Sequence, residues 1–146
     1  MNRDTELDHV TTHLLPAAAA LFRLLTREAS GGISWAESGV LRALSDGPRR
    51  ITDLAQLEAL AQPTVTLLVK RLEEQGLVRR ERQSDDQRVV LVSLTDAGRS
   101  ALEQLRTRVR ALLRTYMDSL PDERLSALSA ATDALSELAT ALRERS

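Results

Sequence analysis

Residues 51–99 read ITDLAQLEALAQPTVTLLVKRLEEQGLVRRERQSDDQRVVLVSLTDAGR, and this stretch decides the fold. Apolar residues at near-helical spacing after Thr52 predict a short helix that Thr52 caps. The chain then turns through residues 58–61. Pro63 predicts the start of a second helix, because proline has no N–H to leave unpaired in a first turn. Gly76 ends that helix in the left-handed conformation that helix ends prefer.

The second helix has two different faces. Four apolar residues at spacings of three and four predict the face that packs inward, namely Val65, Leu68, Val69 and Leu72. The other side is free to contact another molecule and carries Thr64, Leu67, Lys70, Arg71 and Glu74.

An arginine-rich hairpin follows the second helix. Residues 77–82 and 88–94 are rich in β-branched and basic side chains, and they flank a polar tip at 83–87. Such runs around a tip without apolar residues predict two paired strands. Thr95 and Asp96 then cap another helix. A helix, a turn, a second helix and a hairpin together form the arrangement that lays one helix in a DNA groove and clamps the backbone with a wing.

The chain closely resembles the MarR family of winged helix-turn-helix transcriptional regulators. The motifs that carry the resemblance lie within residues 33–99, and the flanking helices agree by length and pattern. These motifs are Leu54-Ala55, Pro63-Thr64-Val65-Thr66, Leu68-Val69, Arg71-Leu72-Glu73, Gly76-Leu77-Val78, Asp86-Gln87-Arg88, Leu94-Thr95 and Gly98-Arg99.

The resemblance implies a mainly α (α+β) fold: a winged helix-turn-helix with a short β-hairpin wing and N- and C-terminal dimerisation helices. Residues 1–146 are then expected to form a single MarR-type domain. Its DNA-binding core is 33–99, and the helices at 4–29 and 100–146 form the dimerisation region, with 4–25 and 121–142 as the interface. Alternatively, the C-terminal helices fold back on their own chain.

The flanking segments have helical periodicity of their own. Pro16 predicts a kink or break in the first helix, which Gly31 and Gly32 terminate. Ser34 predicts the cap of a second helix that runs through Leu44. These outer helices carry more apolar surface than a small winged domain can cover. Pairing with a second copy would bury that surface, and a two-fold dimer would read two inverted half-sites about one helical turn apart.

Composition narrows the possible functions. The chain has 146 residues, a net charge of −1 and no cysteine, and all but one of its 20 basic residues are arginine. The net charge of the whole chain therefore does not attract nucleic acid. If the chain binds nucleic acid, local clusters of basic residues must supply the attraction. Without cysteine there is no disulfide, thiolate metal site or thiol switch. No apolar run reaches membrane-spanning length and no signal peptide is present, so we expect a cytoplasmic protein without a membrane partner.

The residue types on the second helix suit base recognition. Glutamine can bond adenine, threonine and leucine can cover a thymine methyl, and lysine can reach guanine or phosphate. An ordinary solvated face is the alternative. Many relatives carry arginine where Leu67 stands and an acid where Lys70 stands, so their base preferences should not be transferred. Ala61 stands where relatives often have a capping serine.

Two arginines, Arg82 and Arg88, flank the tip of the hairpin. The resemblance implies that Asp86 braces the wing and that an arginine reaches the minor groove. A surface ion pair is the alternative, and Arg79 and Arg80 either contact DNA or point along the strand. The predicted DNA-binding residues are Gln62, Pro63, Thr64, Thr66, Leu67, Lys70, Arg71, Arg82, Ser84, Asp86 and Arg88.

Other candidate sites are fewer. His9 and His13 lie four apart, but two ligands do not make a metal site, so neither a metal nor a cofactor is expected. The resemblance places a small-molecule pocket between the dimer helices and the winged domain, which Phe22, Trp35 and Arg42 could line unless they are core or edge residues. We find no catalytic constellation. The sequence therefore predicts a homodimeric repressor of a palindromic DNA operator, released by a phenolic or lipophilic effector. The alternative is a winged-helix protein-interaction module.

Overall fold

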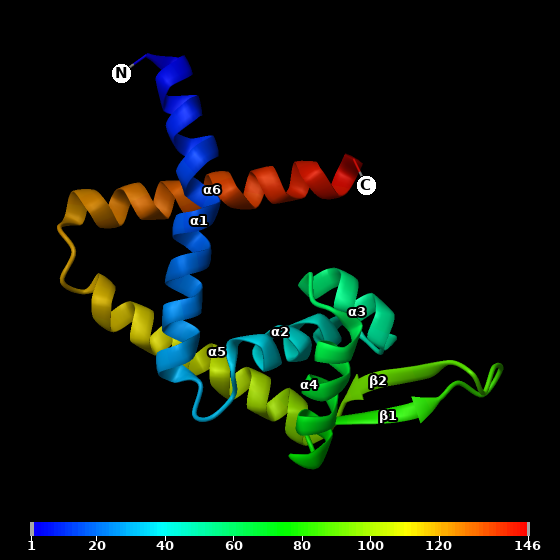
Figure 1. The fold of residues 1–146 in the computed structure, drawn as a ribbon. Coiled ribbons are helices and arrows are strands. Elements are labelled where there is room, and N and C mark those ends of the chain that lie inside the picture. The colour runs from blue at the N-terminus through cyan, green and yellow to red at the C-terminus, as the bar shows by residue number, and fades with distance from the viewer. Residues whose placement is uncertain (1, 146) are drawn as a thin grey trace. The chain divides into compact units, whose positions relative to one another are not determined.

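The computed structural model describes residues 2–145 (Figure 1). Its helices and strands, in chain order, are α1 (Arg3–Ala29), α2 (Trp35–Ala43), η1 (Leu44–Asp46), α3 (Ile51–Glu58), α4 (Gln62–Glu74), β1 (Val78–Arg82), β2 (Val90–Leu94), α5 (Asp96–Met117) and α6 (Asp122–Arg145). They form two compact units, one reaching to Arg110 and the other beginning at Ala111. The prediction that the chain is one domain stays a prediction.

The core of the first unit lies between α2, α3, α4 and the hairpin. Leu41, Leu54 and Leu72 are fully buried there. The predicted inner face of α4 is confirmed, since its four apolar residues are all buried. The helix spans Gln62–Glu74, whereas Pro63 and Gly76 predict a helix from 63 to 75, so it lies one residue earlier at each end.

The sequence prediction for the start of α3 was wrong. The helix begins at Ile51 with Arg50 as its N-cap, so Thr52 lies inside the first turn and caps nothing. The reason is a long-range contact. The backbone of Arg49 pairs with Val92 of β2, with N–O distances of 2.9 and 2.8 Å. This pairing keeps the chain extended as far as Arg50 and so fixes where the helix starts.

The turn between α3 and α4 places an alanine in an uncommon conformation. Ala59 has a φ of 52°, in the left-handed region that glycine usually occupies. Its N–H still bonds to the last turn of α3, and the N–H of Leu60 bonds to the carbonyl of Ala55. Ala61 then begins α4 without a side-chain cap, as predicted. The turn between the two helices is therefore held by backbone hydrogen bonds, without a side-chain cap at the start of α4.

The predicted hairpin is confirmed, with shorter strands than expected. Val78 of β1 pairs with Leu94 of β2, and Arg82 pairs with Val90. The inward side chains at the base, including Val92, are buried in the core. Figure 1 shows the hairpin projecting beyond α3 and α4, which leaves its basic half in solvent.

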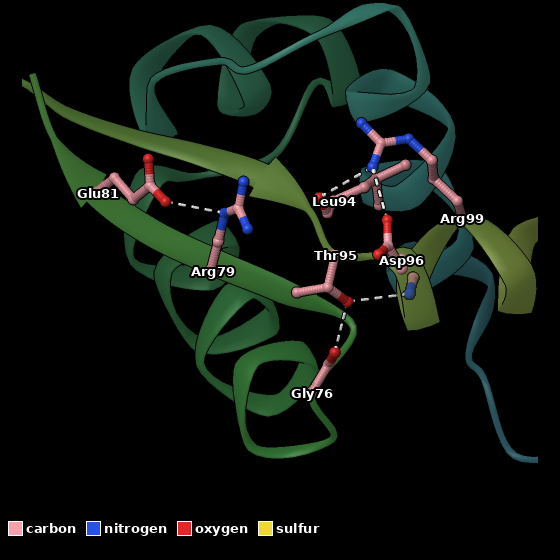
Figure 2. A network of polar contacts seen from close by, with 8 residues as sticks. Gly76, Arg79, Glu81, Leu94, Thr95, Asp96 and Arg99 are labelled. Atoms are coloured by element: carbon pink, nitrogen blue, oxygen red, sulfur yellow. Dashed lines mark hydrogen bonds and ion pairs between the residues drawn. The ribbon is translucent and has the colours of Figure 1, made fainter.

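A single threonine joins four elements at the base of the hairpin (Figure 2). The hydroxyl of Thr95 donates to the carbonyl of Gly76 at 2.6 Å and accepts the N–H of Gly98 at 3.0 Å. Its backbone N–H donates to the carbonyl of Leu77 at 3.1 Å. Thr95 therefore caps α5, as predicted, whereas Asp96, the other predicted cap residue, is the first residue of the helix. Thr95 also holds the end of α4 against the junction of β2 and α5.

The flanking helices differ in how much they bury. The Ser34 cap of α2 is confirmed: its side chain accepts the Glu37 N–H at 3.1 Å, and the Glu37 carboxylate accepts the Ser34 N–H at 3.1 Å. α1 continues through Pro16, so the predicted break is absent, and it buries only residues near its C-terminal end. α6 buries none of its described residues within the single chain. Among residues 2–145, no helix combines the length and apolarity needed to cross a membrane.

Two glycines of this unit should respond differently to alanine. A Cβ on Gly98 would collide with the backbone carbonyl of Leu77, whereas one on Gly39 would meet the movable end of the Glu58 side chain. We expect Gly98→Ala to lower the free energy of unfolding by about 3 kcal/mol. Gly39→Ala should change it by less than about 1 kcal/mol, because alanine favours the helix. Urea unfolding followed by circular dichroism measures both, and equal losses would contradict the close contact at Gly98.

Candidate nucleic-acid interface

The exposed face of α4 gathers the predicted contact residues of that helix. At 3.6 residues per turn, Pro63, Leu67 and Lys70 lie near the middle of the face opposite the buried one. Leu67 is 48% exposed although it is a large apolar residue. The remaining predicted residues of the helix are also exposed, namely Gln62, Thr64, Thr66 and Arg71. The structure therefore presents all seven candidates to solvent on one element.

The hydroxyl of Thr66 is already occupied within the helix. It donates to the carbonyl of Gln62 at 3.0 Å. Such a bond to the preceding turn satisfies a threonine locally. The side chains of Lys70 and Arg71 have no hydrogen-bond or ion-pair partner among residues 2–145. Their charges are therefore available to a molecule placed against α4.

The arginines of the hairpin divide into bound and free ones. Arg79 pairs with Glu81 at 2.9 Å, and Arg80 pairs with Glu73 of α4 at 2.8 Å. Arg82 donates to the Gln87 carbonyl at 2.6 Å, which ties one side of the tip to the other. The guanidinium of Arg88, in contrast, has no partner within the part of the chain that the structure describes. Ser84, also in the tip segment, is exposed.

Asp86 contacts the backbone of Arg88 rather than its guanidinium. The Asp86 carboxylate accepts the N–H of Arg88 at 3.0 Å, a local bond that stabilises a tight turn. No ion pair joins the two side chains among residues 2–145, which argues against the surface-pair alternative. Asp86 therefore stabilises the turn at the tip and leaves the guanidinium of Arg88 free for another contact.

The Glu73–Arg80 pair was not anticipated from the sequence. The hydrogen bond from Arg80 lowers the pKa of the Glu73 carboxyl, and the same contact raises the pKa of Arg80. The pair is exposed, so it contributes little to stability. The sequence feature that could have indicated it is Gly76, where the chain reverses direction. This reversal places β1 beside α4, so that Arg80 reaches Glu73, seven residues earlier. It also means that Arg80 adds less free positive charge than its position suggests.

The three predicted ligand residues form one cluster. The rings of Phe22 and Trp35 meet edge to face at 5.2 Å between centroids, and the Arg42 guanidinium lies 4.9 Å from each ring. Arg42 also donates to the Ser38 hydroxyl at 3.0 Å. Burial lowers the pKa of Arg42, an effect that the carboxylate of Glu58 opposes. The cluster joins α1 to α2.

An open hollow of about 500 Å³ adjoins this cluster. Trp35 lines it together with residues of α1 and the following turn, including Arg23 and Arg27. Phe22 and Arg42 do not line it. The rings of His9 and His13 lie 4.9 Å apart, but within residues 2–145 no group of three or more potential metal ligands comes together.

Comparisons with known proteins agree with this geometry. The family described as "Transcriptional regulator SarA/Rot" matches residues 26–105. The chain is 30% identical over 95 residues to the HTH-type transcriptional repressor MdtR of Bacillus subtilis, a match that covers 64% of this chain and 61% of MdtR. The chain therefore spans less than two thirds of that relative.

Solved structures extend the likeness over most of the chain. A MarR family protein from Bacillus stearothermophilus is 26% identical, with a TM-score of 0.71 over 96% of this chain and 99% of that one. NadR, solved in complex with 4-hydroxyphenylacetate, is 30% identical, with a TM-score of 0.61 over 89% of this chain and 92% of that one.

The free and the bound arginine should differ in how they affect DNA affinity. We expect Arg88→Ala to lower the salt slope of duplex binding by about 0.9, the value for one lost phosphate contact. Arg80→Ala should change the slope less, because Glu73 already compensates the charge of Arg80. Fluorescence anisotropy with a labelled duplex across a salt series measures both slopes. An unchanged slope for Arg88→Ala would remove that residue from the contact surface.

Proposed function

Because this chain belongs to the MarR-type winged-helix transcriptional regulators, we propose that it is a sequence-specific DNA-binding repressor that acts as a homodimer on an inverted-repeat operator. The observation that carries the proposal is the exposed face of α4 beside a hairpin whose Arg88 is free. A helix followed by a wing docks with the helix in the major groove and the wing against the neighbouring backbone.

The candidate residues take different roles in this docking. Residues on α4 face base edges in the major groove, where each base pair presents its own pattern of donors, acceptors and methyl groups. Arg88 extends from the wing to the minor groove, where narrow A·T-rich DNA concentrates negative potential. Arg82 and Asp86 hold the tip in position. The exposed Ser84 and Arg71 contact the DNA backbone.

The homodimer is proposed from the apolar faces of α1 and α6. In α1, apolar residues recur at alternating spacings of three and four, at Leu7, Val10, Leu14, Ala17, Leu21 and Leu24. In α6, the same spacing joins Leu128, Ala131, Leu135, Leu138 and Leu142. This repeat is the pattern of helices that pack along a seam with other helices. Most of these leucines are exposed in the single chain, and a second copy would remove them from water.

We propose a small phenolic or otherwise lipophilic effector for the region of Phe22, Trp35 and Arg42. The complex of the similar protein NadR with 4-hydroxyphenylacetate supports this chemistry. The aromatic rings supply an apolar surface, and the half-buried guanidinium supplies a charge for an acidic or phenolic oxygen. Such a ligand releases DNA only if it binds better to a dimer whose recognition helices have the wrong separation.

A second candidate function is a winged-helix protein-interaction module that does not bind specific DNA. The net charge of −1 and the apolar Leu67 on α4 favour it. The two functions differ in their behaviour toward random duplex DNA at low salt. A free basic face binds any duplex there, whereas an interaction module does not.

The first test is binding to DNA from the chain's own upstream intergenic region, compared with an unrelated duplex of equal length. We expect tighter binding to the former and a footprint of two half-sites about one helical turn apart. Leu135→Asp, which places a charge on the apolar face of α6, should dissociate the dimer in sedimentation and weaken operator binding. Binding to no duplex, even at low salt, would contradict the proposal and favour the interaction module.

The effector site can be tested through Trp35, the single tryptophan of the chain. We expect 4-hydroxyphenylacetate, or another phenol that releases the operator, to change Trp35 emission in a saturable way. Arg42→Met should weaken this response, because it removes the charge over both rings while keeping an apolar stem. A phenol that released DNA without changing the emission would place the effector site elsewhere.

A further inference from the structure

The middle of the exposed face of α4 is apolar where a DNA reader usually offers hydrogen bonds. Leu67 is 48% exposed and Pro63 is exposed one turn before it, on the same side. Neither side chain can donate or accept a hydrogen bond. An exposed leucine alone needs no explanation, but here its neighbours on the helix continue the same chemistry.

Thr66 adds to this apolar strip. Its hydroxyl donates to the Gln62 carbonyl at 3.0 Å. The hydroxyl hydrogen is thereby engaged within the helix. The γ-methyl of Thr66 and the acceptor lone pairs of its oxygen are left for an outside contact. Pro63, Thr66 and Leu67 together offer solvent an apolar strip over the first turns of the helix.

The charges that follow the strip favour a contact through the N-terminal part of α4. Lys70 follows one turn after Leu67 and has no partner among the described residues. Glu74 follows one turn later on the same side and is exposed. A carboxylate at that position is repelled by DNA phosphates. The helix is therefore suited to enter the groove at its N-terminal end.

We propose that this helix selects its operator through thymine methyl groups, with Leu67 and the methyl of Thr66 each covering the 5-methyl of a thymine. The inference rests on the proposed DNA-binding function and states which base the helix selects. In the major groove the 5-methyl of thymine is the apolar group by which one base differs from the others. A surface made of Leu67 and the methyl of Thr66 has no donor or acceptor, so it gains from burying the thymine methyl and leaves a polar base edge against it unpaired.

The test begins with the operator itself. The full-length protein selects duplexes from a random library, and each thymine in the enriched site is then replaced singly by deoxyuridine. This change removes one 5-methyl and keeps every hydrogen-bonding group. At the thymine opposite Leu67 we expect binding about four-fold weaker, the effect of one buried methyl. At a position where cytosine is tolerated, 5-methylcytosine should bind tighter than cytosine by a similar factor.

Matched variants identify the residues that sense the methyl. In Leu67→Ala the difference between thymine and deoxyuridine should disappear at one position. In Thr66→Ser, which keeps the hydroxyl and removes the methyl, the difference between thymine and deoxyuridine should disappear at the neighbouring thymine. Thr66→Val keeps a methyl without the hydroxyl, so this variant should still bind thymine more tightly than deoxyuridine there. All three variants change exposed side chains, at positions 66 and 67, so circular dichroism should show unchanged folding.

The outcomes separate the two levels of the proposal. An enriched site whose affinity changes less than two-fold on every replacement of thymine by deoxyuridine would overturn methyl recognition and leave the DNA-binding function intact. Selection that enriches no sequence from a folded protein would overturn both. A difference that persists in Leu67→Ala and in Thr66→Ser would also overturn the assignment to these residues.

Discussion

The hydroxyl of Thr95 is the contact on which the arrangement of the winged unit depends. It accepts the N–H of Gly98 and donates to the carbonyl of Gly76, so the start of α5 and the end of α4 are held by one oxygen atom. The close approach of α5 requires the absence of a side chain at Gly98. β1 begins and β2 ends next to this contact. The angle between the exposed face of α4 and the hairpin is therefore set by a few atoms at its base.

Most of the fold could be predicted from local pattern. The faces of α4 follow from apolar spacing, its end follows from Gly76, and the start of α2 follows from Ser34, because each signal acts within one or two turns. The start of α3 could not be predicted, since the pairing of Arg49 with Val92 overrides the capping preference of Thr52. Contacts between positions so far apart leave no periodic trace in the sequence.

In the candidate site, too, local pattern predicted some features and long-range contacts determined others. The sequence placed the α4 residues on an exposed face because burial follows from spacing. It favoured Arg82 and Arg88 over Arg79 and Arg80 as DNA contacts, but it did not show which of these guanidinium groups are already bound within the chain. Three of them bind neighbouring groups, and only the structure shows that Glu73 holds Arg80 while Arg88 is left free. A near-neutral chain can thus still offer a positive surface, because its ion pairs remove some charges and leave others exposed.

The near absence of lysine has a chemical consequence. Acylating reagents and acetyltransferases neutralise ammonium groups and leave guanidinium groups charged. Every basic residue of this chain except Lys70 is an arginine. Lys70 is exposed in the middle of the outward face of α4. Among the side chains, amine acylation can therefore remove a positive charge at one place only, and that place lies on the helix that faces the bases.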